Sequence, residues 1–365
     1  MRQLILACVA AGFAATRLLA GPLGMPIFTN QPPDPAIQPA ETGEVPQWTG
    51  SFTYSGATYT FTMVGTDPSL GSATTTIPVQ IIPVIFKFSN GVTLDPTANS
   101  CGDSSPALSR VENSPLFQPT TFTPGGTNVG TTQYEDAFMR ANFWNFVSSS
   151  ASNYHILLGS PTVSTPVTIT VPQAFGQTAA GSCSAGGATN NGQVGLMAYD
   201  YYRILLRQIL NGIPSTTLPI VLNYNTFWYQ ATTTNCCILG FHGATGKAPN
   251  QGIFSTAAYS DPGLFSVPIQ DIHALSHELG EAINDPFVNN KVPGWTGGQV
   301  SGCSTILEVG DPVTGIAFEV TMNGFTYHPE DLVFLPWFEK STAPTTSVNG
   351  WYTFLNSFPG PTFCK

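Results

Sequence analysis

The sequence DIHALSHELGEAINDPF, residues 271–287, predicts a helix with a well-defined end. Its apolar residues recur at helical spacing from about Pro268 or Asp271 to Ile283. The asparagine that follows tolerates a left-handed backbone, and Pro286 disfavours helical geometry in the residue before it. We therefore expect one helix here, closed by a turn.

One face of this helix combines histidine and glutamate. Side chains four positions apart share a helix face, so His273, His277 and Glu281 form a single stripe. Glu278 lies beside the stripe, about 100° around the helix axis from His277. Histidine nitrogens and carboxylate oxygens bind divalent cations, so the stripe indicates a metal site. The alternative is a helix whose histidines simply pack under a loop.

The acidic residues and histidines of the chain gather in the same region. Nine of the 21 acidic residues and three of the five histidines lie within residues 271–331, where Lys291 is the only basic residue. Converging carboxylates raise one another's pKa, and a bound cation makes such a cluster favourable. The alternative is an acidic face exposed to solvent, which does not explain the histidines. The other two histidines, His155 and His242, are interpreted as ordinary strand or loop residues.

The order His277-Glu278-x-x-Glu281 resembles the H-E-x-x-H signature of the zincin metallopeptidases. In that family two helical histidines hold zinc, and the glutamate between them takes a proton from the metal-bound water. The resemblance implies His277 and Glu281 as metal ligands and Glu278 as the catalytic base. A carboxylate in place of the second histidine shifts the preference toward harder ions. We expect a divalent metal, with zinc favoured over calcium or manganese.

A third ligand is expected downstream of the helix. In zincins with a glutamate third ligand, that residue comes from a later element, which implies Glu308, 27 residues beyond Glu281. Four further residues are expected to serve as alternative ligands or to support the ligands by hydrogen bonds: His273, Asp285, Asp311 and His328.

The resemblance extends beyond the helix, over about residues 270–312. The segments His277-Glu278-Leu279, Asp285-Pro286-Phe287 and Glu308-x-Gly310-Asp311 are similar to a pattern in uncharacterised exported bacterial proteins. More distantly, they resemble the plant EXORDIUM (phosphate-induced) cell-wall proteins. That family has no settled enzymatic activity. It therefore implies a rival function, that of a non-catalytic secreted or wall-associated protein with a structural ion or none.

The N-terminus has the features of an export signal. Arg2 precedes an apolar or small run from Leu4 to Ala15, and Ala20 is a small residue suited to cleavage. Residues 1–20 are predicted to be a signal peptide, which places the mature chain in the periplasm or outside the cell. Residues 21–47 hold seven prolines and are expected to form an extended lead-in, with order beginning near residue 48.

Removal of the signal peptide leaves an even number of cysteines, which favours disulfides in an exported chain. These cysteines are Cys101, Cys183, Cys236, Cys237, Cys303 and Cys364. We expect Cys303 to pair with Cys364. The adjacent Cys236 and Cys237 either join each other or take different partners.

The remaining segments predict a β-rich α+β fold. A hairpin is expected over 52–63, helices over 132–147 and 196–210, and strands at 77–88, 166–171, 217–224, 238–242 and 254–259. These elements predict a single large domain over 48–365, with a zincin-like core of mixed sheet and motif helix. Its upper lobe extends to about residue 284, and an irregular C-terminal subdomain covers 285–365.

Composition excludes several classes of protein. Only 9% of the 365 residues are charged and the formal net charge is −10, which argues against nucleic acid and anionic membranes as partners. The 12% of aromatic residues argues against disorder. No stretch reaches the roughly 20 apolar residues that a membrane-spanning helix requires.

Together these features predict an exported metal-dependent hydrolase, most consistent with a metallopeptidase that acts on a peptide or protein substrate. The EXORDIUM-like non-catalytic protein is the main alternative. A carbohydrate-binding module is a third hypothesis, which rests on the aromatic-rich C-terminal part alone.

Overall fold

The computed structural model describes residues 23, 26–40, 43–149, 153–182 and 192–364. The predicted signal peptide and Cys183 therefore lie outside the described residues. Within these ranges the fold is rich in strands with a few helices, which confirms the predicted α+β class. None of the described helices is long and apolar enough to cross a membrane.

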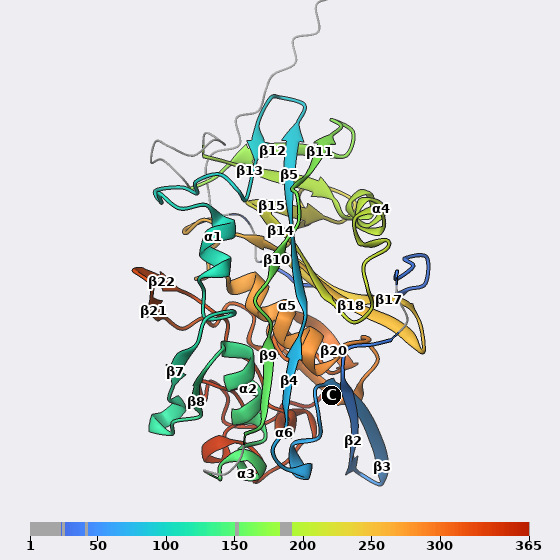
Figure 1. Ribbon diagram of the computed structural model, residues 1–365, viewed down its shortest axis with the longest axis vertical. Helices are drawn as coiled ribbons and strands as arrows, with labels where there is room; N and C mark the ends of the chain where they lie inside the picture. The colour runs from blue at the N-terminus through green and yellow to red at the C-terminus, as the bar shows by residue number, and fades with distance from the viewer. Residues whose placement is uncertain (1–22, 24–25, 41–42, 150–152, 183–191, 365) are drawn as a thin grey trace, which may run out of the picture.

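A mixed sheet of eight strands occupies the centre of the described structure (Figure 1). Its strand order is β1-β17-β18-β14-β5-β10, and β6 and β11 also pair with β5. The strands are β1 (Gln31–Asp34), β5 (Val79–Phe88), β6 (Thr93–Leu94), β10 (Thr162–Val163), β11 (Val167–Val171), β14 (Leu218–Tyr224), β17 (Gly240–Lys247) and β18 (Asn250–Tyr259). Strand β14 runs parallel to both neighbours and is covered on both faces, so all seven of its residues are buried.

A smaller sheet and several two-stranded units surround this sheet. The smaller sheet has the order β12 (Gly176–Ala180), β13 (Gln193–Ala198), β15 (Thr226–Tyr229) and β16 (Cys236–Ile238). The hairpins are β2 (Gln47–Tyr54) with β3 (Ala57–Val64), β7 (Thr120–Phe122) with β8 (Gly130–Thr132), β19 (Lys291–Gly297) with β20 (Val300–Ile306), and β21 (Val320–Met322) with β22 (Phe325–Tyr327). Strand β4 (Thr74–Ile77) pairs in parallel with β9 (His155–Leu158).

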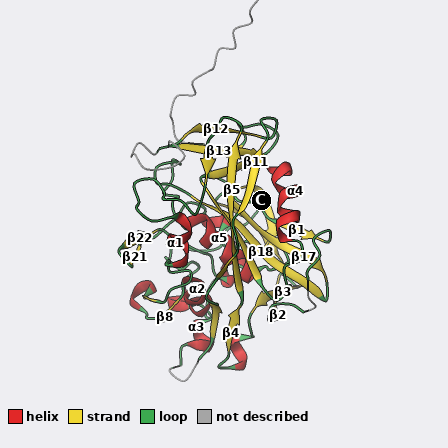
Figure 2. Cartoon of the chain, turned by 45° about the horizontal axis from the view of Figure 1, so that its top comes forward, coloured by secondary structure: helices red, strands yellow, loops and turns green. Residues whose placement is uncertain are grey.

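The helices are short, and one of them is central. They are α1 (Ala107–Glu112), α2 (Tyr134–Asn142), α3 (Trp144–Val147), α4 (Tyr199–Leu210), α5 (His273–Asn284) and α6 (Leu335–Phe338). Helix α5 packs against β17, β18 and β3, and α2 contacts it. Figure 2 shows α5 near the centre, among the strands, and α4 at the right of the view. All twelve residues of α5 are buried, including its histidines and glutamates.

Most of the predicted elements are present, with shifted boundaries. The hairpin over 52–63 is β2–β3, the predicted strands correspond to described strands, and the motif helix is α5. The helix expected over 132–147 is divided into α2 and α3, because Phe143 leaves helical geometry and packs its ring against Trp48. The helix expected over 196–210 starts only at Tyr199, because the preceding residues form β13.

The Pro-rich segment 21–47 differs from its prediction. Its described residues include an extended strand, so order does not begin only near residue 48. Its residues Gln31–Asp34 form β1, which pairs in parallel with β17 at one edge of the central sheet. Pairing with a strand that lies far along the chain gives this segment its order, and nothing in its local sequence announces that partner.

The described cysteines form disulfides. Cys303 and Cys364 are bonded, which confirms the predicted pair. Cys236 and Cys237 are bonded to each other, so the first of the two alternatives holds. Cys101 is also disulfide-bonded.

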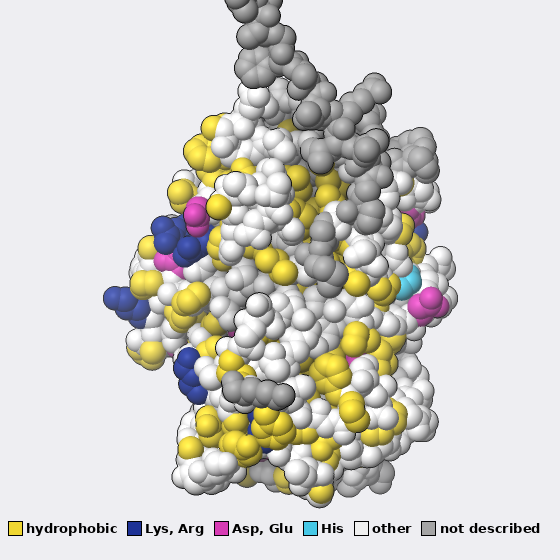
Figure 3. All heavy atoms as spheres, turned by 180° about the vertical axis from the view of Figure 1, so that it is seen from behind, with side chains coloured by type: hydrophobic (Ala, Val, Ile, Leu, Met, Phe, Trp, Pro, Cys, Tyr) yellow, Lys and Arg dark blue, Asp and Glu magenta, His cyan; other side chains and the backbone are white. Residues whose placement is uncertain are grey.

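The surface is poor in charge, as the composition predicts. On the face shown in Figure 3, charged side chains are few and scattered among hydrophobic and uncharged groups. Seven of the nine acidic residues within 271–331 are buried. The interpretation of that region as a solvent-exposed acidic face is therefore wrong.

Candidate metal centre

The predicted stripe of histidine and glutamate lies on α5, inside the molecule. His277 Nε2 is 3.1 Å from Glu281 Oε1, one helical turn further along. His277 and Glu278 have no exposed surface, and Glu281 is 2% exposed. Burial of ionised groups is costly unless other charges or ions compensate it. The surroundings of this stripe therefore determine whether it can hold a cation.

His277 is held in a defined orientation by Glu330. Its Nδ1 is hydrogen-bonded to Glu330 Oε2, while Glu330 Oε1 interacts with His273 Nε2 at 3.0 Å and accepts a hydrogen bond from Gly315 N at 2.9 Å. A carboxylate on one ring nitrogen fixes the tautomer and leaves the other nitrogen available as a ligand. His273, which was predicted to support the ligands by hydrogen bonds, contacts Glu330, and Glu330 was not among the predicted site residues.

His242 is a second histidine of the cluster, and it comes from β17. Its Nε2 donates a hydrogen bond to the Asp285 carbonyl at 3.2 Å. Its Nδ1 lies 3.3 Å from Glu281 Oε2 and 3.5 Å from Glu278 Oε2. The interpretation of His242 as an ordinary histidine is therefore wrong, since it faces two carboxylates of the motif helix.

Two groups of three side chains in the described structure bring their ligand atoms close enough to share an ion. The groups are His242 with Glu278 and Glu281, and His277 with Glu281 and Asp311. Glu281 belongs to both, because each of its oxygens faces a different histidine. Metal–ligand bonds of about 2.1 Å in a tetrahedral site place neighbouring ligand atoms roughly 3.4 Å apart. The histidine-to-carboxylate distances of 3.1 to 3.6 Å fit this spacing.

Several buried atoms of the cluster have no hydrogen-bond partner. They are His242 Nδ1, His277 Nε2, both carboxylate oxygens of Glu278, and Glu308 Oε2. A buried polar atom without a partner costs about 1–3 kcal/mol, and more if it is charged. A divalent cation binds lone pairs of histidine and carboxylate together, so the residues present fit such an ion.

The pKa values of the cluster are strongly perturbed. Burial raises the pKa of Glu278 to about 7 and, together with Glu281, raises that of Asp311 well above its usual range. Burial lowers the pKa of His277, but Glu281 and Glu330 outweigh it and raise that pKa well above normal. Burial raises the pKa of Glu281, but His277 and His242 outweigh it and hold that pKa below normal. Burial and the close approach of these groups thus move each of these four pKa values away from its normal range.

Two glycines allow the close approach of the cluster side chains. A Cβ at Gly310 would lie 2.3 Å from His277 Nδ1, and one at Gly240 would lie 2.7 Å from Glu278 Cγ. Real Cβ atoms do not approach other atoms so closely. Glycine is therefore required at these two positions, where the loop before Asp311 and the start of β17 lie close to the cluster side chains.

The N-terminal strap, which we define as residues 27–34, covers the cluster. The ring of Phe28 stacks on His277 with 3.7 Å between ring centroids. Asn30 Nδ2 donates a hydrogen bond to Glu308 Oε1 at 2.7 Å. The strap and the surrounding elements leave the α5 residues of the cluster with almost no exposed surface.

Glu308, the predicted third ligand, reaches the cluster but belongs to neither ligand group. Its Oε1 accepts the hydrogen bond from Asn30, and its Oε2 lies 3.9 Å from His242 Nε2. Asp311 instead joins His277 and Glu281, with its Oδ1 3.6 Å from His277 Nε2. Glu308 and Asp311 both lie in the predicted downstream segment, and only Asp311 belongs to a group of side chains that could share an ion.

Asp285 supports the backbone near the cluster. Its side chain accepts hydrogen bonds from the backbone N–H groups of Asn289 and Asn290, at 2.9 and 3.1 Å. Burial raises its pKa to about 7. Asp285 therefore stabilises the turn after α5, and its carbonyl orients His242.

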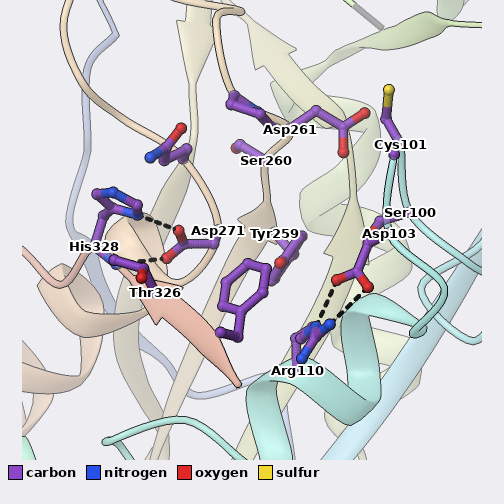
Figure 4. A pocket seen from close by; sticks show the side chains of 14 residues that line it. Ser100, Cys101, Asp103, Arg110, Tyr259, Ser260, Asp261, Asp271, Thr326 and His328 are labelled. Atoms are coloured by element: carbon purple, nitrogen blue, oxygen red, sulfur yellow. Dashed lines mark hydrogen bonds and ion pairs between the residues drawn. The ribbon is translucent and has the colours of Figure 1, made fainter. Parts of the chain in front are cut away.

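His328, another predicted alternative ligand, lies in a separate cavity of about 470 Å³ (Figure 4). Its Nδ1 is 2.7 Å from Asp271 Oδ2, and this contact raises the pKa of His328. A second ion pair, Arg110 with Asp103, lines the same cavity. His328 is therefore not part of the histidine and carboxylate cluster around α5.

Signals for the residues that were missed are weak. Glu330 lies within the acid-rich region, where converging carboxylates were expected. No motif in the sequence indicates its contact with His277. His242 has no local motif, because its neighbours form an ordinary buried strand. His242 reaches the site only because β17 packs against α5.

Comparisons with known proteins give no match. Neither a protein-family model, nor a curated protein, nor a solved structure is significantly similar to this chain.

Proposed function

We propose that this protein is a secreted or periplasmic metal-dependent hydrolase of the metallopeptidase type. The observation that carries the proposal is the convergence of unpartnered, buried histidine nitrogens and carboxylate oxygens around α5. The proposed ligands are His277, Glu281 and Asp311, and the proposed general base is Glu278.

The choice between the two ligand groups rests on solvent access, because the Asp311 side chain is 15% exposed whereas all three members of the other group are buried. His277 is held through Nδ1 by Glu330, as metal-binding histidines usually are by a carboxylate or carbonyl. His242 is held in the same way by the Asp285 carbonyl, and its other nitrogen lies 3.3 Å from Glu281 Oε2 and 3.5 Å from Glu278 Oε2. We therefore assign the ion to His277, Glu281 and Asp311, and we assign Glu278 with His242 to proton transfer.

Glu278 has the properties of a general base. Burial raises its pKa to about 7, near which proton transfer at neutral pH is most efficient. In peptide hydrolysis, a water oxygen adds to the carbonyl carbon and the C–N bond breaks. Glu278 would take the proton from that water and deliver it to the leaving amine. A bound ion would supply charge stabilisation at the carbonyl oxygen.

The donor set narrows the identity of the ion. The imidazole nitrogen suits zinc better than calcium, whereas two carboxylates also admit manganese. We propose zinc first, with manganese and calcium as competitors.

Metal analysis of the purified protein tests the proposal. Wild type grown with zinc, manganese and calcium is expected to carry about one equivalent of metal, and His277→Ala is expected to lose it. His242→Ala is the matched control on the other ligand group, and it should keep the metal. A metal-free wild type would rule out the proposal, and loss in His242→Ala alone would move the ion to the other group.

The rival function is a non-catalytic secreted protein with a structural ion. The burial of every member of the cluster except Asp311 favours it, because a catalytic ion needs access to substrate. Glu278→Gln separates the two functions. An enzyme keeps its metal and its melting temperature and loses turnover, whereas a structural site changes its melting temperature and has no turnover to lose.

A further inference from the structure

A buried cluster can act on a substrate only if a segment that covers it moves away. The N-terminal strap is such a segment, because Phe28 contacts His277 and Asn30 contacts Glu308. Ile27 N donates a hydrogen bond to Cys237 O at 2.9 Å, and Leu239 N donates one to Ile27 O at 3.1 Å. Further along, Gln31 is in register with Gly243 and Asp34 with Thr245. The strap is thus an extended segment added to the edge of the central sheet.

Alternate side chains of the strap point to opposite sides, as in a strand. Phe28 and Asn30 face the cluster, where they contact His277 and Glu308. Thr29 and Gln31 instead engage Tyr199 of α4, and the Tyr199 hydroxyl donates to Gln31 Oε1 at 3.2 Å. An extended peptide that binds at a sheet edge is recognised in the same way, because its alternate side chains enter pockets on one face.

The backbone of the strap is also held by a side chain that contacts the proposed metal ligands. Gln299 Nε2 donates to the Phe28 carbonyl at 3.1 Å, and Phe28 N donates to Gln299 Oε1. The same Gln299 amide contacts Asp311 Oδ1. One residue thus connects the strap backbone to a carboxylate of the ligand group.

We propose that the strap occupies the substrate position of this protein, and that the substrate is an extended peptide with an aromatic side chain. After the strap has left, such a peptide would pair with the edge of β17 that the strap occupies in this structure, through main-chain hydrogen bonds. Its aromatic ring would then stack on His277. The strap must leave before substrate enters, so the structure is the closed form. This inference rests on the proposed hydrolase function for its catalytic consequence, but not for peptide binding.

Two variants open the strap from opposite sides. Phe28→Ala with Asn30→Ala removes its contacts with the cluster. Gly243→Ala acts from the sheet, because a Cβ there would lie 2.6 Å from the Gln31 carbonyl oxygen. The matched controls are Phe146→Ala, at an exposed phenylalanine of α3, and Gly360→Ala, where an added Cβ meets nothing within 4 Å.

The first measurement is extraction of zinc from the zinc-loaded full chain by a colorimetric chelator. Both opening variants are expected to release zinc at least tenfold faster than wild type, and both controls at the wild-type rate. Thermal melting identifies any variant that fails to fold, and the other opening variant then carries the test. Wild-type release rates in a folded opening variant would overturn the proposal.

The second measurement is binding of a labelled synthetic peptide of residues 26–36 to the Phe28→Ala/Asn30→Ala variant, measured by fluorescence polarisation. Gly243→Ala serves as the control here, because its added Cβ would meet the Gln31 carbonyl of the peptide as it meets that of the strap. The proposal is supported if the peptide binds the Phe28→Ala/Asn30→Ala variant at least tenfold more tightly than it binds wild type or Gly243→Ala, and at least tenfold more tightly than a peptide with Phe28→Ala binds the same variant. Absence of binding overturns it, since the strap would then be only a cover. Binding without hydrolysis of casein would leave this inference standing and remove the hydrolase function.

Discussion

Gly310 has no side chain because the ring of His277 occupies that space. A Cβ there would lie 2.3 to 2.7 Å from three ring atoms, and the ring cannot retreat while Glu330 holds it. Overpacking of this kind costs about 1–3 kcal/mol. We expect Gly310→Ala to weaken metal binding at least tenfold in a competition assay with a chelator. Unchanged affinity, equal to that of Gly360→Ala, would contradict the close approach described here.

Glu135 on α2 is a buried carboxyl group in which neither oxygen has a hydrogen-bond partner. Burial raises its pKa well above the usual range, although the charge of His277 opposes this. A raised pKa means that the folded state binds the proton more tightly than the unfolded state does. Its contribution to stability is complete below about pH 4.3, the unfolded value, and is lost as the pH rises through the folded pKa.

Glu135→Gln tests this pH dependence, because glutamine stays neutral at every pH. Urea denaturation at several values between pH 4 and pH 8 should show the wild type losing free energy of unfolding relative to the variant as the pH rises. The exposed Glu319→Gln serves as control and should follow the wild type. Parallel curves for wild type and Glu135→Gln would show that Glu135 ionises in the folded state as easily as in the unfolded one.

Residue-level prediction succeeded where the signal is local. His277 and Glu281 were predicted to meet because they lie four positions apart on one helix, and they do. Glu330 and His242 meet His277 and Glu281 only through tertiary packing. No spacing rule links residues so far apart in sequence, so a single sequence contained no signal for these contacts.

At the scale of elements, Asn290 joins the end of α5 to the hairpin β2–β3. Its side chain accepts a hydrogen bond from Thr62 N at 2.8 Å and donates to the carbonyls of Thr62 and Asn284 at 2.7 Å each. Asn290→Ala would leave these buried groups unpaired. We expect a loss of about 1–3 kcal/mol in the free energy of unfolding. The exposed neighbour Asn289→Ala should change it little, and equal effects would show that Asn290 has no special role.

The elements themselves were largely foreseeable. Alternation predicts β2–β3, and helical spacing with a stop signal predicts α5 within a few residues at each end. The break at Phe143 was not foreseeable, because it arises from packing against Trp48, which lies far away in sequence.

At the scale of the molecule, the bond between Cys303 and Cys364 closes a loop with a sequence separation of 61 residues. That loop carries Glu308, Asp311 and Glu330. A loop of this length implies a stabilisation of about 4 kcal/mol through restriction of the unfolded chain. Replacing both cysteines by serine should therefore lower the free energy of unfolding by about that amount and weaken metal binding. Ser301→Ala on the same strand is the control, and a loss below about 1 kcal/mol would refute the estimate.

The global arrangement was the least predictable level. The Pro-rich segment has no periodicity, so its place over the cluster could not be inferred from its own residues. Its order depends on β17, whose edge it completes.

The strap also has a consequence for the order in which the molecule assembles. Gln31 and Gly243 are separated by roughly two hundred residues, and such distant pairings form late because loop closure must precede them. During folding, α5 and the neighbouring strands can collapse while their histidines and carboxylates still face water. The proposed ion would enter at that stage, before the strap covers the cluster. The strap, although it is made first, would then dock last, and the rate of its docking would set the time available for the proposed ion to bind.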